Sequence, residues 1–359
     1  VVAGAVSAVV GDFTTFLILR FLVGTSSPGI FNSLYCLALE FVGPDKRMPI
    51  GTCYMLFFTA GYLLTPVVGY FIGNWRTLLL AVSLYGVLYI PYWWIIPESP
   101  RWLISKGRIS EAELTLKKIA KSNNTQLPVN WLRIISQEDR GGHLSSTQSF
   151  LYLCKFSKLR LRTINICFNW FVNSAVYYGL SLSTSNLGGN PYLNALLAGA
   201  VEVPAHTFVL LVLNKLGRRI PLLLCMITAG TSLLLTTMFS RDVAWIQIVL
   251  CMIGKMAITA SFGIIYLFTA ELYPTNIRNA VVGTGSMFAR IGGIVAPTIN
   301  ILDQVWVSAP SLVLGLLSCI AALLALLIPE TLNKKLPESL QEAEGLEKKR
   351  RSRDSDVTA

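Results

Sequence analysis

Charged side chains are scarce in this chain of 359 residues. Asp, Glu, Lys and Arg make up 14% of the sequence, hydrophobic residues make up 53%, and the mean hydropathy is +0.58. A soluble domain of this size needs a larger polar share to cover its surface, so the composition excludes one. Apolar stretches long enough to cross a bilayer recur along the chain, which predicts an all-α, polytopic membrane protein.

Histidine is also rare, and the cysteines follow no ligand pattern. The chain has 2 His and 7 Cys, and most of the cysteines lie within apolar stretches. They lack metal-site spacing, and their odd number argues against a disulfide framework. The sequence shows no Ser-His-Asp set and no phosphate-binding loop. It therefore predicts no enzyme, no cofactor and no metal.

Basic residues concentrate between the apolar stretches, as they do in cytosolic loops of membrane proteins. The net charge of +11 is therefore attributed to loops of a protein embedded in a lipid bilayer, and no nucleic-acid partner is predicted. The longest basic interruption is predicted to be a central cytosolic loop with short helices. The predicted parts are the remainder of an N-terminal transmembrane half (1–96), the loop (97–163), a C-terminal transmembrane half (164–328) and a cytosolic tail (329–359).

A single arginine interrupts the apolar stretch that follows Arg278. At a rise of about 1.5 Å per residue, Arg290 lies roughly 18 Å beyond Arg278, near the middle of a hydrocarbon core about 30 Å thick. A charge at that depth is tolerated where it faces the bundle interior or a water-filled cavity. Arg290 is therefore a candidate binding residue, and the alternative is an arginine that only pairs with a neighbouring helix. Close backbone approach is expected at the glycines around it, Gly283, Gly285, Gly292 and Gly293.

Motifs at the ends of the apolar stretches point to one family. The most specific is ELYPTNIRN at 271–279, and it is accompanied by PESPRWL at 97–103, GRR at 217–219 and PETLN at 329–333. Together they resemble the organic ion transporters of the major facilitator superfamily, solute carrier family twenty-two, over essentially the whole chain. PESPRWL also occurs in sugar porters, but the glutamine pair of those proteins is absent from 164–183.

The resemblance implies a twelve-helix fold in two halves, with a small organic ion substrate bound between them at mid-membrane and alternating access to the two sides. By this count the 1–96 part runs from the end of helix three to helix six, and the 164–328 part holds helices seven to twelve. The first two helices are expected to be missing from the front. A multi-pass protein of the plasma membrane is expected, with sodium and protons both left open as coupling ions. The alternative is a truncated, non-transporting product that binds a partner or substrate.

Ionisable residues near the middle of separate apolar stretches form the predicted binding site. Glu202, Lys255 and Arg290 sum to one positive charge, which favours a carboxylate-bearing substrate held by the arginine fork. Glu202 either pairs with one of the cations or receives a substrate ammonium. The resemblance adds Asn173 to the predicted binding residues. In the family that is resembled, the positions of Arg290 and Asn173 are aspartate in cation carriers. Zwitterions or organic anions, such as carnitine-like solutes, are the leading hypothesis, and organic cations are the alternative.

Aromatic residues spaced four apart share a helix face and are predicted to complete the site. Their rings are suited to a quaternary ammonium through cation–π attraction, although packing in a bundle core is an alternative for each of them. The candidates are Phe31, Tyr35, Tyr177, Phe262 and Tyr266, of which Tyr177 matches a pocket tyrosine of the family. His206 follows Glu202 by four residues and is interpreted either as a proton-linked switch or as a neutral packing residue.

Charged residues at the predicted cytosolic helix ends form a second candidate set. Pairing between them is expected to hold the outward-open state and to break when the protein opens inward. The set comprises Glu40, Arg47, Glu98, Arg101, Arg218, Arg219, Glu271, Arg278 and Glu330.

Overall fold

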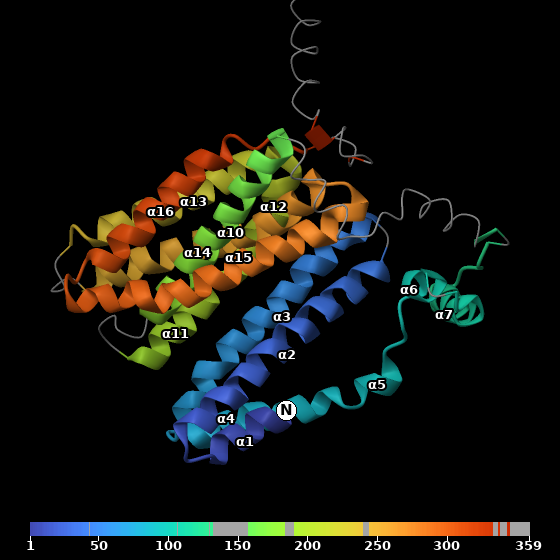
Figure 1. Ribbon diagram of the computed structural model, residues 1–359, viewed down its shortest axis with the longest axis horizontal. Helices are drawn as coiled ribbons and strands as arrows, with labels where there is room; N and C mark the ends of the chain where they lie inside the picture. The colour runs from blue at the N-terminus through green and yellow to red at the C-terminus, as the bar shows by residue number, and fades with distance from the viewer. Residues whose placement is uncertain are drawn as a thin grey trace, which may run out of the picture. The chain divides into compact units, whose positions relative to one another are not determined.

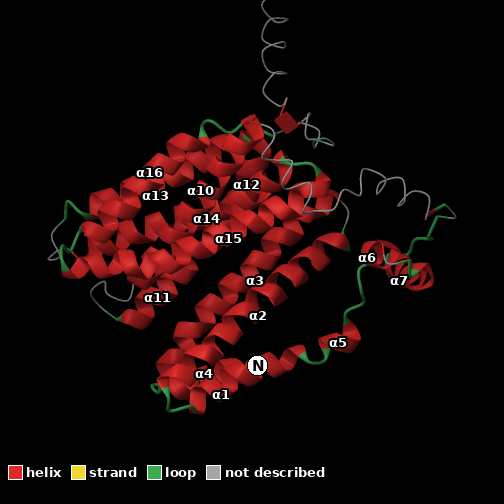
Figure 2. Cartoon of the chain, in the orientation of Figure 1, coloured by secondary structure: helices red, strands yellow, loops and turns green. Residues whose placement is uncertain are grey.

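The computed structural model is helical and has no strand in the part of the chain that it describes (Figure 2). The described residues are 1–42, 44–105, 107–128, 130–131, 157–183, 190–239, 244–332, 337 and 343–344. The prediction of an all-α protein is therefore confirmed. The chain divides into two compact units, residues 1–140 and 141–359.

Within the described ranges, six helical segments are long and apolar enough to cross a membrane. They are Phe13–Tyr35, Pro49–Phe71, Pro191–Leu213, Arg219–Thr236, Trp245–Leu272 and Ala280–Gln304. Shorter apolar helices occur at Trp75–Tyr89 and Ala309–Ala325. These segments agree with a multi-pass membrane protein.

The first unit contains α1 (Val2–Val9), α2 (Phe13–Glu40), α3 (Pro44–Phe71), α4 (Trp75–Tyr85), the short 3₁₀ helix η1 (Gly86–Tyr89), α5 (Tyr92–Ile95), α6 (Pro100–Ser105) and α7 (Ile109–Ser122). In this unit α1 packs against α2 and α4, and α2 packs against α3 (Figure 1). The Asp12 carboxylate starts α2 by accepting a hydrogen bond from the Thr15 N–H at 2.8 Å. The apolar stretch 77–96 is not one helix, because Pro91 has no N–H with which to continue the helical ladder.

The second unit contains α10 (Ser157–Ser183), α11 (Pro191–Ala200), α12 (Glu202–Leu216), α13 (Arg219–Thr236), α14 (Ala244–Leu272), α15 (Thr275–Ile301), the 3₁₀ helix η4 (Leu302–Gln304) and α16 (Ala309–Ala325). In this bundle α10 packs against α14, α15 and α16, while α13 packs against α14 and α16 (Figure 1). The asparagines on the buried face of α10, among them Asn169 and Asn173, therefore contact protein instead of lipid.

Glycine on α15 allows α10 to approach closely. A Cβ atom at Gly292 would lie 3.0 Å from the Ala175 backbone nitrogen, with the Phe171 carbonyl oxygen nearer still. A Cβ atom at Gly285 would lie 2.7 Å from the indole nitrogen of Trp170. The prediction of close backbone approach is confirmed at Gly292, whereas at Gly285 the neighbour is the Trp170 side chain. It is wrong at Gly283, where nothing lies within 4 Å of the Cβ position.

A break at Val201 separates α11 from α12 inside one apolar stretch. Pro204 lacks the N–H that would donate to the Ala200 carbonyl, and its ring crowds that carbonyl, so the helix cannot run through regularly. Glu202 consequently lies in the first turn of α12. A carboxylate is favoured there because the unpaired N–H groups at the start of a helix carry partial positive charge.

Candidate functional site

A buried polar cluster lies in the second unit where side chains of α10, α12 and α14 meet. The Lys255 ammonium lies 3.4 Å from the Glu202 carboxylate, and the two side chains are 0% and 1% exposed. The Tyr177 hydroxyl donates a hydrogen bond of 2.6 Å to the same carboxylate oxygen. Lys255 also donates to the Ser181 hydroxyl oxygen. The structure thus joins Glu202 to Lys255 as its cationic partner.

The aromatic face of Tyr177 completes the surroundings of Lys255. The Lys255 Nζ atom lies 3.1 Å from the centroid of the Tyr177 ring. A desolvated cation over an aromatic face gains about 2 kcal/mol. Tyr177 therefore offers its ring to the ammonium group and its hydroxyl to the carboxylate of the same ion pair.

Aromatic rings extend from this cluster along α14. The Phe262 ring centroid is 6.0 Å from that of Tyr177 and 5.9 Å from that of Tyr266. Trp170 of α10 contacts both α14 rings, at 5.9 Å from Phe262 and 4.3 Å from Tyr266. The indole N–H of Trp170 donates to the Thr269 hydroxyl at 3.1 Å.

Arg290 lies on α15 with an exposed side chain. Its guanidinium group acts electrostatically on the Tyr266 side chain. Phe262 and Tyr266 therefore form an aromatic strip from the Lys255 cluster toward Arg290.

Asn173 points away from the Glu202 cluster. Its side chain is 0% exposed, and its amide nitrogen donates to the Asn169 carbonyl at 2.9 Å and lies 3.6 Å from the Met226 sulfur of α13. Its amide oxygen has no hydrogen-bond partner among the described residues. The structure therefore places Asn173 one helical turn from Tyr177 without joining it to Glu202 or Lys255.

His206 lies one turn beyond Glu202 on α12 and is 7% exposed. Its interaction with Glu202 is electrostatic. The histidine therefore lies beside the cluster, within electrostatic reach of its carboxylate.

The remaining aromatic candidates lie in the first unit. Phe31 and Tyr35 of α2 both pack against Tyr54 of α3, with ring centroids 4.9 and 5.5 Å apart. The Tyr54 hydroxyl donates to the Phe31 carbonyl at 2.9 Å. Sequence reasoning missed Tyr54, which is a third ring in this group.

Trp170 and Ser181 were also missed, although a spacing signal was present. Both lie on the face of α10 that carries Tyr177, since Ser181 follows it by four residues and Trp170 precedes it by seven. Extending the four-residue rule along α10 in both directions finds Ser181 directly.

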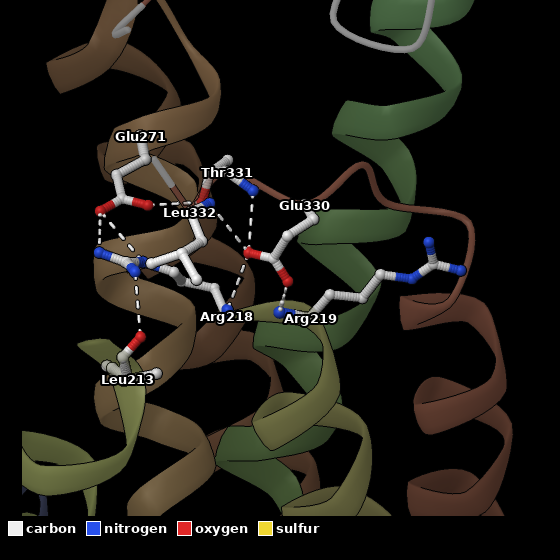
Figure 3. A network of polar contacts seen from close by, with 7 residues as sticks. All are labelled: Leu213, Arg218, Arg219, Glu271, Glu330, Thr331 and Leu332. Atoms are coloured by element: carbon white, nitrogen blue, oxygen red, sulfur yellow. Dashed lines mark hydrogen bonds and ion pairs between the residues drawn. The ribbon is translucent and has the colours of Figure 1, made fainter. Parts of the chain in front are cut away.

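A second polar network joins helix ends at the predicted cytosolic side of the second unit (Figure 3). The Arg218 guanidinium binds the Glu271 carboxylate at 2.9 Å and donates to the Leu213 carbonyl at 3.1 Å. The Thr331 hydroxyl donates to the other oxygen of Glu271. This network links the start of α13 to the end of α14 and to the chain that follows α16.

Glu330 binds the start of α13 through its carboxylate oxygens (Figure 3). They accept backbone N–H groups of Arg218 and Arg219 at 2.9 Å each, and of Thr331 and Leu332 at 2.9 and 3.1 Å. Burial alone would raise the pKa of the Glu330 carboxyl, but these donors outweigh it and hold the pKa below its ordinary value. The Arg219 guanidinium points away from Glu330.

Gly217 makes this contact sterically feasible. Its φ angle is +84°, and a Cβ atom there would lie 2.6 Å from a Glu330 carboxylate oxygen. A side chain at this position would strain the backbone and collide with Glu330. The glycine of the GRR motif therefore leaves room for the Glu330 carboxylate to bind the start of α13.

The other charged candidates at the predicted cytosolic helix ends lie outside this network. Glu98 of the first unit pairs with Arg108 at 3.2 Å, and Arg108 also pairs with Glu111 at 2.6 Å. The Arg278 guanidinium donates to the Tyr273 carbonyl at 3.4 Å. The side chains of Glu40, Arg47 and Arg101 lie outside the described part of the structure.

Sequence comparisons identify transporters as relatives. Residues 1–342 match the family model "sugar (and other) transporter". The organic cation transporter protein of Drosophila melanogaster is 42% identical over 353 residues, covering 96% of this chain and 64% of that protein. Solute carrier family 22 member 2 of Rattus norvegicus is 36% identical over 357 residues, covering 99% of this chain and 64% of that protein. The chain thus spans 64% of the length of these curated relatives.

Solved structures share the fold. The proton:xylose symporter XylE bound to 6-bromo-6-deoxy-D-glucose has a TM-score of 0.74 at 18% identity, covering 96% of this chain and 80% of that chain. A partially occluded, inward-open XylE from E. coli has a TM-score of 0.71 at 17% identity, covering 93% and 79%. These likenesses confirm the predicted fold class, and the matched proteins are transporters and not enzymes, as the sequence predicted. The chain belongs to the sugar (and other) transporter family of the major facilitator superfamily, among the relatives of solute carrier family 22.

Proposed function

We propose that this protein moves small organic ions across a membrane by alternating access, with a substrate carboxylate bound by Arg290. The charge balance in the second unit carries the proposal. The contact between Glu202 and Lys255 compensates one charge of each sign inside the bundle. Arg290 is exposed and forms no ion pair with any described residue, so it supplies the positive charge for a substrate.

The chemistry next to Arg290 favours carboxylates and zwitterions over simple cations. A planar guanidinium group binds a carboxylate through two parallel hydrogen bonds, and it repels a cation. The ring of Tyr266, which is within electrostatic reach of Arg290, and the adjoining ring of Phe262 offer an apolar and π-rich surface for the rest of the substrate. Carnitine-like zwitterions and organic anions are therefore the proposed substrates.

Organic cations are the second candidate. The Drosophila melanogaster relatives carry the names organic cation transporter protein and organic cation transporter-like protein, at 42% and 41% identity. In this structure the Glu202 carboxylate and the Tyr177 ring already surround a cationic group, that of Lys255. Those two side chains are suited to a substrate cation if Lys255 moves away.

Uptake measurements separate these candidates. A labelled carnitine-like zwitterion, tetraethylammonium and a dicarboxylate are supplied to cells that express this chain or a version extended to the length of its relatives. Arg290→Asp should abolish uptake of the zwitterion and increase uptake of tetraethylammonium, and Arg290→Lys should retain part of the zwitterion uptake. Unchanged substrate preference in Arg290→Asp would remove Arg290 from the site, and binding without uptake would favour a binding protein.

We also propose the plasma membrane as the location of this transport. The solute carrier family 22 relatives support this location, and the positive charge in the predicted loops and tail places those parts on the cytosolic side. Surface biotinylation of intact cells should label the protein. Exclusive recovery in an internal membrane fraction would contradict it.

A further inference from the structure

The groups around the Lys255 ammonium come from two other helices. Glu202 of α12 supplies a carboxylate at 3.4 Å, and Tyr177 of α10 supplies a ring face at 3.1 Å. Ser181 of α10 accepts a hydrogen bond from the ammonium while its own hydroxyl donates to the Tyr177 carbonyl at 2.7 Å. A carboxylate, an aromatic face and a neutral oxygen acceptor are the groups that recognise ammonium ions in general. The acceptors on α10 and α12 therefore form a cation site that is separate from α14, the helix whose lysine occupies it.

A purely structural role explains this ion pair poorly. Burying both charges costs desolvation free energy that the attraction between them often fails to recover, so apolar residues of similar size would stabilise the bundle at least as well. The lysine also has a flexible four-carbon stem, along which its ammonium group can withdraw without movement of the backbone. The pair is thus built in a way that permits exchange.

The site adjoins a series of aromatic rings that becomes more exposed away from Lys255. Tyr177 is 9% exposed, and Phe262, whose ring centroid is 6.0 Å away, is partly exposed, as is Tyr266. The Tyr177 ring thus contacts both the Lys255 ammonium and a more exposed ring, that of Phe262.

We propose that Tyr177, Glu202 and Ser181 form an ammonium-binding site that Lys255 fills as an internal ligand, and that a substrate ammonium binds by displacing it. The identity of the displacing ligand rests on the proposed function, whereas the site itself does not. The displaced lysine needs a new anion inside the bundle, because an uncompensated buried charge is costly. A zwitterion supplies both groups, its ammonium to Glu202 and its carboxylate to Lys255 and Arg290, whereas a simple cation leaves Lys255 uncompensated. The exchange therefore selects zwitterions.

Chemical rescue of Lys255→Ala tests the site without any transport. The substitution removes three methylene groups and the ammonium, which together match n-propylammonium. This probe should raise the thermal unfolding midpoint of the purified variant by about 2–4 °C at saturating concentration. The wild-type protein should not respond, because Lys255 fills its site, and 1-propanol should have no effect on the variant because it has the same length without charge.

The double variant Lys255→Ala/Glu202→Gln is the matched control, since it keeps the cavity and removes the anion. It should not respond to n-propylammonium. An equal response in the double variant, or no response in Lys255→Ala, would overturn the site. If Lys255→Ala does not fold alone, it is expressed with either compound in the medium. In that case, recovery of folded protein with n-propylammonium but not with 1-propanol supports the site. Recovery with both compounds, or with neither, overturns it.

Uptake then tests the exchange separately. Lys255→Met keeps the volume of the side chain and removes its charge, so a simple cation no longer has to displace an ammonium group. The ratio of tetraethylammonium uptake to zwitterion uptake should rise by about tenfold. An unchanged ratio would refute the selection by exchange. Successful chemical rescue in a protein that transports nothing would retain the ammonium site and reject the proposed function.

Discussion

Two ion pairs between described residues of the second unit lie in different surroundings. Lys255 and Glu202 are 3.4 Å apart with side chains 0% and 1% exposed, whereas Arg218 and Glu271 are 2.9 Å apart with side chains 11% and 17% exposed. The first pair lies in the middle of the bundle, where the Tyr177 ring and hydroxyl contact its two charged groups. The second adjoins backbone groups at helix ends, which water can also reach.

The difference in exposure suits the two ion pairs to different roles. Opening the pair at the helix ends exposes its charges to water, which solvates them at small cost. Opening the pair inside the bundle leaves each charge without solvent, so it requires a ligand that takes the place of the departing group. The end network is therefore suited to conformational change, and the inner pair is suited to exchange with a charged solute.

Removal of one partner of the inner pair should give the largest loss of stability. We expect Lys255→Ala to lower the free energy of unfolding by about 3–5 kcal/mol, because the buried Glu202 carboxylate loses the cation with which it pairs. The double variant Lys255→Met/Glu202→Gln removes both charges and should lose much less. Denaturant titration of both purified variants measures this. Equal losses in the two would mean that packing, and not charge, holds the cluster together.

A change in packing without any charge sharpens the comparison. We expect Gly292→Ala to cost about 2–3 kcal/mol, because the new methyl group collides with the α10 backbone at Phe171 and Ala175. Gly283→Ala on the same helix is the matched control. Its methyl group meets open space, so a neutral or slightly stabilising effect is expected. Thermal unfolding of the two variants checks this, and similar losses would contradict the close crossing of α10 and α15.

The network at the helix ends should show a smaller effect that depends on pH. Folding lowers the pKa of Glu330 below its ordinary value of 4.5, so its stabilising effect is present above that pH and is lost as the pH falls through the folded-state pKa. We expect Glu330→Gln to cost about 1–2 kcal/mol at neutral pH, because hydrogen bonds to a charged acceptor are lost. The cost should shrink on acidification below about pH 4.

Unfolding midpoints of wild type and Glu330→Gln between pH 3 and 7 test this expectation. Arg219→Ala is the control, because Arg219 binds Glu330 through a backbone N–H that the substitution retains. A gap between wild type and Glu330→Gln that is as large at pH 3 as at pH 7 would show that the Glu330 charge does not stabilise the start of α13.

Much of the fold followed from local composition. A side chain in a membrane helix meets either lipid or protein, and both favour apolar residues, so hydropathy alone predicts spans such as Ala280–Gln304. Motifs such as ELYPTNIRN predicted the family because they are contiguous. Counting from Arg278 also placed Arg290 near mid-membrane, since the helical rise is constant.

The choice of partners was decided only by tertiary structure. Periodicity gives the depth of a residue and its face on one helix, but it does not say which helix lies opposite. Glu202 therefore had two available cations, and only the packing of α12 on α14 brings it to Lys255 and leaves Arg290 exposed. For the same reason Gly283 and Gly292 look alike in the sequence, although a Cβ atom would meet the α10 backbone at Gly292 and nothing within 4 Å at Gly283. The sequence by itself determined the membrane helices and the charges they carry, and the packing of those helices decided which charges pair with each other and which one stays exposed.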